Sequence, residues 1–373
     1  MLKTSAYAAI SAKSQLRPFI IERREPGPHD VLIDILFCGV CHSDIHQVRG
    51  EWGGETFPMV PGHEIAGSVA TVGDQVKKWK IGDTVGIGCF VDSCRKCEPC
   101  KKGDEQYCDK GPHYTYNSRE RDGKTPTHGG YSTRITVDEN YLLRIPESIS
   151  LEKAAPLLCA GITTYSPLRH FGVKKGDSVA IAGLGGVGHM GVKLAKAMGS
   201  KVAVLSHSTN KMDDALRLGA DEFIPTKNRD VFQKNAKRFH FILDTISARH
   251  DYADYLNLLR LDGTMVLLGL PDPAPLSAAP LIMGRRRLAG SVIGGIRETQ
   301  EMLDFCAQHN VASDTEIIPV QKINEAYERV LKNDVRYRFV IDIASLKSAK
   351  IESIPSCGNS FITTPTPSRK ERN

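Results

Sequence analysis

Four cysteines within fifteen residues give this chain its clearest chemical signal. They are Cys94, Cys97, Cys100 and Cys108, spaced C-x2-C-x2-C-x7-C in a hydrophilic segment. Four thiolates at this spacing can surround one Zn²⁺ ion and stabilise a loop that has no apolar core of its own. Because four protein ligands leave no position for a substrate, we predict a structural zinc site.

Two other interpretations of this cluster remain open. A disulfide cluster would need an oxidising compartment, and the N-terminal segment lacks the apolar run of a secretory signal. An iron–sulfur loop of the bacterial ferredoxin type ends in C-x3-C-P, whereas here the last gap is seven residues and no proline follows Cys108. The sequence therefore favours zinc.

A second motif, G-x-G-x-x-G, is formed by Gly183, Gly185 and Gly188. It lies between the apolar run SVAIA and a segment of helical periodicity, which is the context that makes this motif informative. The glycines would permit a tight turn, close approach of a pyrophosphate and close packing of the helix. We therefore predict a dinucleotide site, and a glycine-rich turn without a ligand is the alternative.

The residues after the next predicted strand bear on which dinucleotide is bound. A site for NAD usually has Asp or Glu there to bind the ribose 2′-hydroxyl. This chain has Ser206, Ser208 and Lys211 instead, with no carboxylate before Asp213. Hydroxyls and a lysine suit a 2′-phosphate, so we predict NADP(H). The alternative role for these residues is a helix cap followed by solvated side chains.

The elements that must position these motifs fall into two parts. The first 150 residues are patterned as strands and turns, with few long helical periods. From about residue 156 apolar strands alternate with amphipathic helices, for example KVAVLS, FHFILDT and YADYLNLLRL, which is typical of a doubly wound parallel sheet. Asp244 and Thr245 would then lie at the carboxyl end of a strand, where ligands bind or a helix is capped.

Composition limits the class of protein. With 373 residues the chain is long enough for two domains, and 41% hydrophobic and 25% charged residues are ordinary for a globular protein. The formal charge of +6 is too small and scattered to indicate nucleic-acid binding. No segment is apolar over the length of a membrane span, so we predict a cytoplasmic protein without a membrane partner.

Further metal-capable residues lie outside the cysteine cluster. Cys41 occurs in CGVCHSDIH, His63 and Glu64 in PGHEIAG, and Cys159 in LLCAGITTY. Spacing alone does not link residues so far apart, and Cys38-x-x-Cys41 also has to be considered as a redox pair.

These segments, the cysteine lobe and GLGGVGHMG occur in an order that resembles the zinc-dependent medium-chain alcohol dehydrogenase family, in particular its cinnamyl-alcohol-dehydrogenase-like branch. The resemblance covers about residues 5–345. It implies an α/β protein: a Rossmann-type domain plus a mostly β, GroES-like catalytic domain that carries the zinc-binding lobe.

By this resemblance, Cys41, His63 and Cys159 hold a catalytic zinc with an open fourth position, giving two zinc ions per chain. Glu64 lies behind the metal, and Asp44 accepts a hydrogen bond from His63. Cys38 is an unliganded core thiol.

The resemblance also implies how the reaction proceeds. The metal polarises an aldehyde, and the nicotinamide, contacted by Thr163, supplies hydride. Ser43 passes a proton to the product, and His46 exchanges it with solvent. The expected activity is that of an NADP-dependent zinc alcohol dehydrogenase or aldehyde reductase.

The family pattern divides the chain into segments with different roles. We expect a catalytic domain over 1–155 with its structural lobe at 89–110, an NADP-binding domain over 156–296, a return to the catalytic domain over 297–346, and a disordered tail over 347–373. By analogy a homodimer is expected.

Trp52 and Phe90 are the first candidates for a pocket, and an uncharged aromatic or aliphatic aldehyde is favoured. Two other functions are considered: a zinc-free NADPH quinone or enoyl reductase of the same superfamily, and a zinc-ribbon protein that binds nucleic acid.

Overall fold

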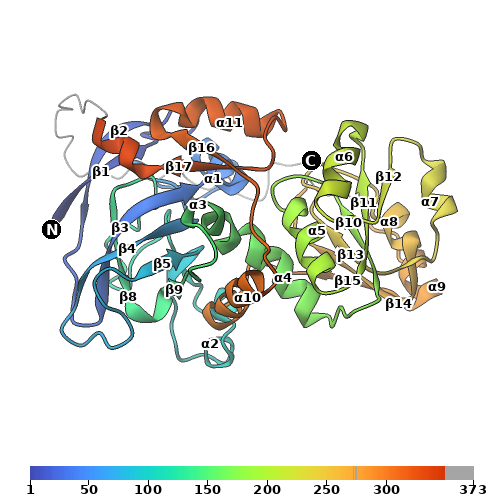
Figure 1. Ribbon diagram of the computed structural model, residues 1–373, viewed down its shortest axis with the longest axis horizontal. Coiled ribbons are helices and arrows are strands. Elements are labelled where there is room, and N and C mark those ends of the chain that lie inside the picture. The colour runs from blue at the N-terminus through green and yellow to red at the C-terminus, as the bar shows by residue number, and fades with distance from the viewer. Residues whose placement is uncertain (272, 274, 349–373) are drawn as a thin grey trace, which may run out of the picture. The chain divides into compact units, whose positions relative to one another are not determined.

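The computed structural model of the chain describes residues 1–271, 273 and 275–348, and the chain divides into two compact units (Figure 1). Unit 1 comprises Met1–Cys159, Gly295–Gln300 and the chain from Asp314. Unit 2 comprises Ala160–Gly294 and Glu301–Ser313. Helix α10 (Ile296–Gln308) therefore contributes residues to both units.

Unit 1 is built on a mostly antiparallel sheet whose central strand, β3, pairs with β4, β8 and β17. Along the main path the order is β16-β17-β3-β4-β5-β9. The strands are β3 (Asp30–Gly39), β4 (Ile65–Val72), β5 (Thr84–Ile87), β8 (Arg134–Asp138), β9 (Leu143–Arg144), β16 (Thr315–Pro319) and β17 (Arg338–Asp342). Strand β17, far from β3 in the sequence, pairs with it antiparallel in this sheet.

Smaller elements complete unit 1. Two additional two-stranded sheets are formed by β1 (Leu2–Ala8) with β2 (Arg17–Arg23), and by β6 (Phe90–Asp92) with β7 (His113–Tyr114). Its helices are α1 (His42–Arg49), α2 (Glu98–Lys102), α3 (Leu151–Ala154) and α11 (Ile323–Leu331). Short 3-10 turns are η1 (Glu105–Tyr107), η2 (Glu139–Tyr141), η3 (Ala155–Leu158), η5 (Val320–Lys322) and η6 (Ile343–Ser348).

Unit 2 is a parallel sheet with helices on both faces, as Figure 1 shows. Its strand order is β12-β11-β10-β13-β14-β15, the Rossmann order in which the direction of winding reverses between β10 and β13. The strands are β10 (Ser178–Ala182), β11 (Lys201–Ser206), β12 (Glu222–Pro225), β13 (Phe239–Asp244), β14 (Leu259–Leu267) and β15 (Arg287–Gly290). The helices are α4 (Ala160–His170), α5 (Gly188–Ala197), α6 (Met212–Arg217) after the turn η4 (Thr209–Lys211), α7 (Asp230–Lys234), α8 (Tyr252–Leu258) and α9 (Ala279–Gly284).

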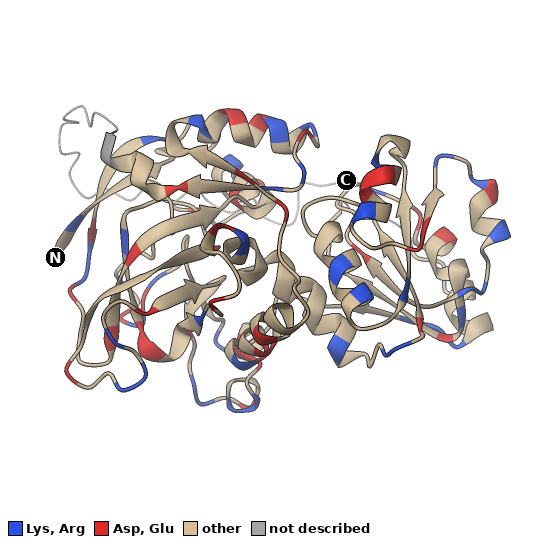
Figure 2. Ribbon diagram, in the orientation of Figure 1, with Lys and Arg blue, Asp and Glu red and all other residues tan. Residues whose placement is uncertain are grey.

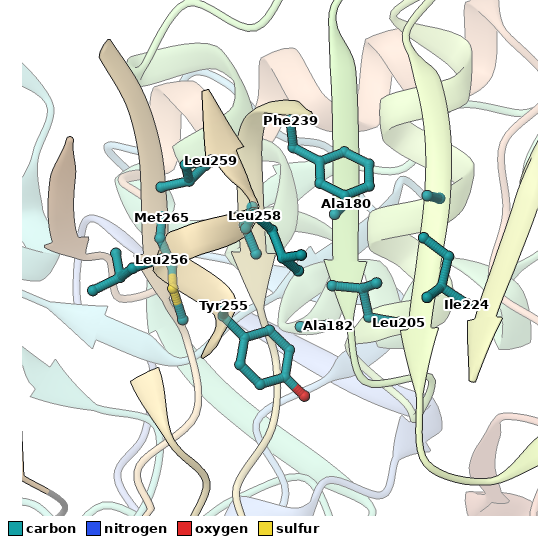
Figure 3. Close-up of a cluster of buried hydrophobic side chains, with 12 residues drawn as sticks. Ala180, Ala182, Leu205, Ile224, Phe239, Tyr255, Leu256, Leu258, Leu259 and Met265 are labelled. Atoms are coloured by element: carbon teal, nitrogen blue, oxygen red, sulfur yellow. The ribbon is translucent and has the colours of Figure 1, made fainter. Parts of the chain in front are cut away.

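The parallel sheet is stabilised by apolar side chains on both of its faces. Figure 3 shows one buried cluster, in which Phe239 and Leu205 from strands lie near Tyr255 and Leu256 from α8. Because both faces are covered, the strands are continuous apolar runs rather than alternating patterns. This arrangement holds the carboxyl ends of β10 and β13 side by side.

The sequence analysis was wrong about one element boundary. It predicts a helix through YADYLNLLRL, but α8 ends at Leu258 and β14 begins at Leu259. Leu259 is fully buried and pairs with Phe239 of β13, so tertiary packing overrides the local helical pattern. The predicted tail is mostly outside the described residues: its first residues, 347 and 348, belong to η6, whereas 349–373, including Cys357, are not described.

Charged side chains are distributed through both units. Figure 2 shows Lys and Arg interspersed with Asp and Glu along the elements of each unit. Among the described residues, no helix is long and apolar enough to cross a membrane.

Candidate metal and dinucleotide sites

The first candidate site is organised by Asp44, which lies fully buried in the first turn of α1. Its Oδ2 accepts hydrogen bonds from the Cys41 backbone N–H (2.9 Å) and the Tyr131 hydroxyl (3.3 Å). Its Oδ1 accepts from the Gly62 backbone N–H (3.1 Å) and lies 3.1 Å from His63 Nδ1. One carboxylate therefore orients Cys41 and His63 together and leaves His63 Nε2 available to a metal.

The structure brings together Cys41, His63, Glu64 and Cys159, whose donor atoms all lie within 4.8 Å of one another. All four residues are buried. The Cys41 and Cys159 sulfurs are 3.9 Å apart, close to the separation of about 3.8 Å expected for two thiolates bound tetrahedrally to one Zn²⁺. Two thiols, an imidazole and an adjacent carboxylate thus fit a zinc ion with one exchangeable position.

The electrostatics of this cluster favour a thiolate at Cys41. Its pKa lies well below the ordinary value, because a hydrogen bond with Cys159 and the positive charge of Arg338 both favour the anion. Burial of Cys38 instead raises the pKa of that thiol well above its usual range. Since Cys38 is fully buried and lies outside the metal-capable group, the contrast supports its interpretation as a core thiol.

Glu64 has a partner that the sequence analysis missed. A guanidinium nitrogen (Nη2) of Arg338, on β17, forms a buried ion pair with Glu64 Oε1. Glu64 Oε2 is buried without a hydrogen-bond partner. Burial raises the pKa of Glu64 to about 7, although the charge of Arg338 opposes the shift. The pairing was not predictable because the two residues are 274 positions apart in the sequence.

The two predicted proton-relay residues lie on the helix that follows Cys41. Ser43 is partly buried, and its Oγ is 3.6 Å from Cys41 Sγ. His46, one turn further along α1, pairs through Nδ1 with Glu51, and its side chain is 28% exposed. A hydroxyl next to the metal-capable group is thus followed on the same helix by a solvent-accessible imidazole.

The two pocket candidates have different surroundings. Trp52 is 45% exposed and stacks on His46, with ring centroids 5.1 Å apart. Phe90 is only 3% exposed and packs edge-on against Tyr141. Phe90 thus lies in the interior of unit 1, whereas Trp52 lies at the surface. An aromatic residue that sequence reasoning missed is Tyr116, which stacks on His63.

The second metal-capable group is the predicted structural lobe. Cys94, Cys97, Cys100 and Cys108 also place their sulfurs within 4.8 Å of one another. Neighbouring sulfurs are 3.3 to 4.0 Å apart, near the edge of a zinc–thiolate tetrahedron and too close for the core of an iron–sulfur cluster to lie between them. All described cysteines are free thiols, so the disulfide interpretation is wrong.

The dinucleotide motif forms a tight turn from β10 into α5. Gly183 has φ +90°, a conformation that favours glycine, and a Cβ at Gly188 would lie 2.1 Å from the Gly183 carbonyl oxygen. No atom lies within 4 Å of a Cβ built at Gly185. The outer glycines are therefore required by the turn, whereas the middle one leaves open space into which a phosphate fits.

The predicted phosphate contacts follow β11. Ser208 is exposed, and Ser206 is buried with its Oγ accepting from the Ser208 backbone N–H (3.3 Å). Lys211 is 8% exposed, and its Nζ donates to the Leu184 carbonyl within the glycine turn (2.8 Å). Thr163 lies partly buried on α4.

Thr245, after β13, contacts the same turn. Its Oγ1 donates to the carbonyls of Ala182 (2.9 Å) and Gly183 (3.2 Å). The residue therefore supports the turn and does not cap a helix.

Comparison with known proteins agrees with this geometry. The sequence-family model of the alcohol dehydrogenase GroES-like domain matches residues 27–147. The sequence-family model of the zinc-binding dehydrogenase domain matches residues 186–308. The chain is 61% identical over 350 residues to NADP-dependent alcohol dehydrogenase C 1 of Mycolicibacterium smegmatis, covering 93% of this chain and all of the relative.

Two solved structures have the same fold. The cinnamyl alcohol dehydrogenase of Sorghum bicolor superimposes with a TM-score of 0.91 at 44% identity, covering 95% of this chain and 100% of that one. CAD from Helicobacter pylori complexed with NADP(H) gives a TM-score of 0.87 at 44% identity, covering 92% and 99%.

The predicted family and fold class are therefore confirmed. The chain belongs to the zinc-binding alcohol dehydrogenase family, and the protein is an oxidoreductase.

Proposed function

We propose that the protein is a zinc-dependent enzyme that transfers hydride between NADP(H) and an alcohol/aldehyde pair. The observation that carries this proposal is the buried set of Cys41, His63 and Cys159, held in part by Asp44. The relative named NADP-dependent alcohol dehydrogenase and the NADP(H) complex of a similar structure support the choice of reaction and cofactor. A zinc-free quinone or enoyl reductase would have no use for this ligand set.

Each metal would have a separate role. Cys41, His63 and Cys159 would hold the catalytic zinc, which when bound polarises a carbonyl oxygen as a Lewis acid. Glu64 would present its unpaired Oε2 to the metal site while Arg338 holds the other oxygen. The cysteine lobe would hold the structural zinc and replace the core that its polar sequence does not provide.

Ser43 and His46 would transfer the proton between the product oxygen and solvent. The Ser43 hydroxyl would donate to the developing alkoxide oxygen of the substrate, because it lies beside Cys41. His46 would exchange the proton with solvent, since its side chain is partly exposed.

Unit 2 would bind the dinucleotide. The turn of Gly183, Gly185 and Gly188 would take the pyrophosphate, and Thr163 would contact the nicotinamide. Ser206, Ser208 and Lys211 would favour the 2′-phosphate, with the ammonium of Lys211 already placed at the turn.

The organisation predicted from the sequence remains a proposal. We propose that the catalytic role belongs to 1–155 and 297–346, and nucleotide binding to 156–296. We further propose that two chains form a homodimer and that the enzyme works in the cytoplasm.

The reaction is tested by assaying a panel of uncharged aromatic and aliphatic aldehydes with NADPH. We expect turnover by the wild type and a loss of roughly a thousandfold or more in Cys159→Ala, since removing a thiolate ligand removes Lewis-acid catalysis worth several kcal/mol. Metal analysis should find two zinc ions per chain in the wild type and one in Cys159→Ala, with NADPH binding retained.

Cys38→Ala is the matched control, because it removes a buried thiol outside the ligand set. The Cys38→Ala enzyme should keep both zinc ions and its activity. If Cys38 and Cys41 were a redox pair, removing the Cys38 thiol would inactivate the enzyme. An active Cys159→Ala enzyme would contradict the catalytic metal.

The structural site is tested by Cys97→Ala. Loss of one ligand should release the lobe zinc and lower the midpoint of thermal unfolding by at least ~5 °C, because metal binding contributes to the folding of the lobe. Lys101→Ala, an exposed change within the same lobe, is the control and should leave both quantities unchanged. Unchanged stability and zinc content in Cys97→Ala would refute the assignment.

Cofactor choice is tested by comparing kcat/KM for NADPH and NADH. We expect a preference of at least about tenfold for NADPH, equivalent to about 1.4 kcal/mol of contact with the 2′-phosphate. Ser208→Asp should bring the two cofactors close to parity, since a carboxylate repels the phosphate and accepts the ribose hydroxyls. Asn228→Asp makes the same change of charge elsewhere on unit 2 and should keep the preference. Parity in the wild type would refute the prediction.

A further inference from the structure

The segment 245–251, which follows β13, is closed by a pair of titratable residues, the buried Asp244 and the partly buried His250. Asp244 is 2% exposed; its Oδ1 accepts from the Ile246 backbone N–H (3.0 Å) and its Oδ2 lies 2.9 Å from His250 Nε2. The other ring nitrogen of His250, Nδ1, lies 2.9 Å from the Ala248 carbonyl oxygen. Asp244 and His250 therefore tie the two ends of this segment together.

The two partners of His250 determine its protonation state. A carboxylate oxygen and a carbonyl oxygen can only accept hydrogen bonds, so both contacts require an N–H on the ring. A neutral imidazole carries one N–H and an imidazolium carries two. The complete closure seen here is thus made only by protonated His250.

The surroundings of His250 are consistent with a charged ring. Burial opposes the charge, but the hydrogen bond and negative charge of Asp244 prevail and raise the pKa of His250 above its ordinary value. Asp251, the N-cap of α8, adds a second negative charge. The ring centroids of Tyr252 and Tyr255, both on α8, lie 5.0 and 5.2 Å from that of His250, and both rings are nearly perpendicular to the imidazole.

The closed segment packs directly on the dinucleotide turn. Asp244 is the register partner of Ala182, the last residue of β10 before Gly183. Thr245 donates to the Ala182 carbonyl from both its backbone N–H and its Oγ1, and its Oγ1 also reaches the Gly183 carbonyl. A Cβ on Gly183 would lie 3.2 Å from Ile246 Cγ1. This is the point between β10 and β13 where the sheet changes its direction of winding and where dinucleotides bind.

We propose that His250 is a positioning residue for the dinucleotide: its protonated ring closes segment 245–251 and so holds Thr245 and Ile246 against the glycine turn. The inference rests on the proposed function, because it assumes that this turn binds NADP(H). When the ring loses its second proton, one of the two hydrogen bonds is lost and the support of the turn is weakened. Dinucleotide affinity therefore falls as His250 deprotonates.

The sign of the pH dependence follows from the direction of the pKa shift. A histidine whose pKa is raised by folding contributes its stabilisation fully below its unfolded pKa of about 6.5, and loses it as the pH rises through the raised value. Losing one hydrogen bond should weaken NADPH binding by about two- to tenfold.

The test is a fluorescence titration of the full-length, zinc-loaded protein with NADPH at several pH values from 6.5 to 9.5. Wild type should show the two- to tenfold loss of affinity, whereas His250→Asn should bind weakly at every pH and lack this step. The 2′-phosphate of the cofactor also titrates, near pH 6. Its effect on affinity is the same for both proteins and therefore cancels when their pH profiles are compared. His170→Asn, an exposed histidine of the same unit, is the control and should retain the wild-type profile.

A second variant tests the link between the segment and the turn. Thr245→Val removes the Oγ1 bonds with little change of volume, so it should reduce the pH-dependent step while His250 still titrates by NMR. Identical pH profiles of NADPH affinity for wild type and His250→Asn would overturn the inference and leave the proposed function intact. Absence of NADPH binding by wild type at every pH would instead refute the proposed function.

Discussion

The structure of the candidate catalytic centre depends on one buried carboxylate. Asp44 accepts hydrogen bonds from backbone groups at Cys41 and Gly62 and contacts the ring of His63, so that two ligand residues from separate parts of unit 1 share one anchor. A buried carboxylate is tolerated only when its oxygens are satisfied, and here each oxygen has two partners. This carboxylate thus orients two of the three expected metal ligands, Cys41 and His63.

The cysteine lobe and the glycine turn could be predicted from the sequence because their residues are close together in the chain. Cys94 to Cys108 make one short loop, and the spacing itself restricts which ions the thiolates can surround. The turn at Gly183 is likewise local, and its outer glycines, Gly183 and Gly188, are required by backbone conformation and by close contacts within the turn and with Thr245. The alternation of strands and helices was sufficient to predict the parallel sheet of unit 2.

Contacts between distant residues could not be predicted in the same way. Cys41, His63 and Cys159 were linked only by resemblance to a family, since periodicity carries no information on which loops meet. Arg338 was missed because a lone arginine at the start of a strand gives no sign of a buried partner 274 residues away. Leu259 was assigned to the wrong element because its burial beside β13 outweighs the helical pattern of the residues before it. His250 was missed for a different reason: its acceptors, Asp244 and Ala248, lie six and two residues before it, but the loop conformation that places them around the ring has no sequence motif.

The ion pair between Glu64 and Arg338 has a consequence for the order of events during synthesis. Glu64 leaves the ribosome long before β17 does, so for most of translation its carboxylate has no guanidinium to neutralise it. Burying an unpaired charge is costly. We therefore expect the region around Glu64 to stay hydrated until β17 pairs with β3. Because this contact joins residues far apart in the sequence, completion of the metal centre would be a late step in the folding of unit 1.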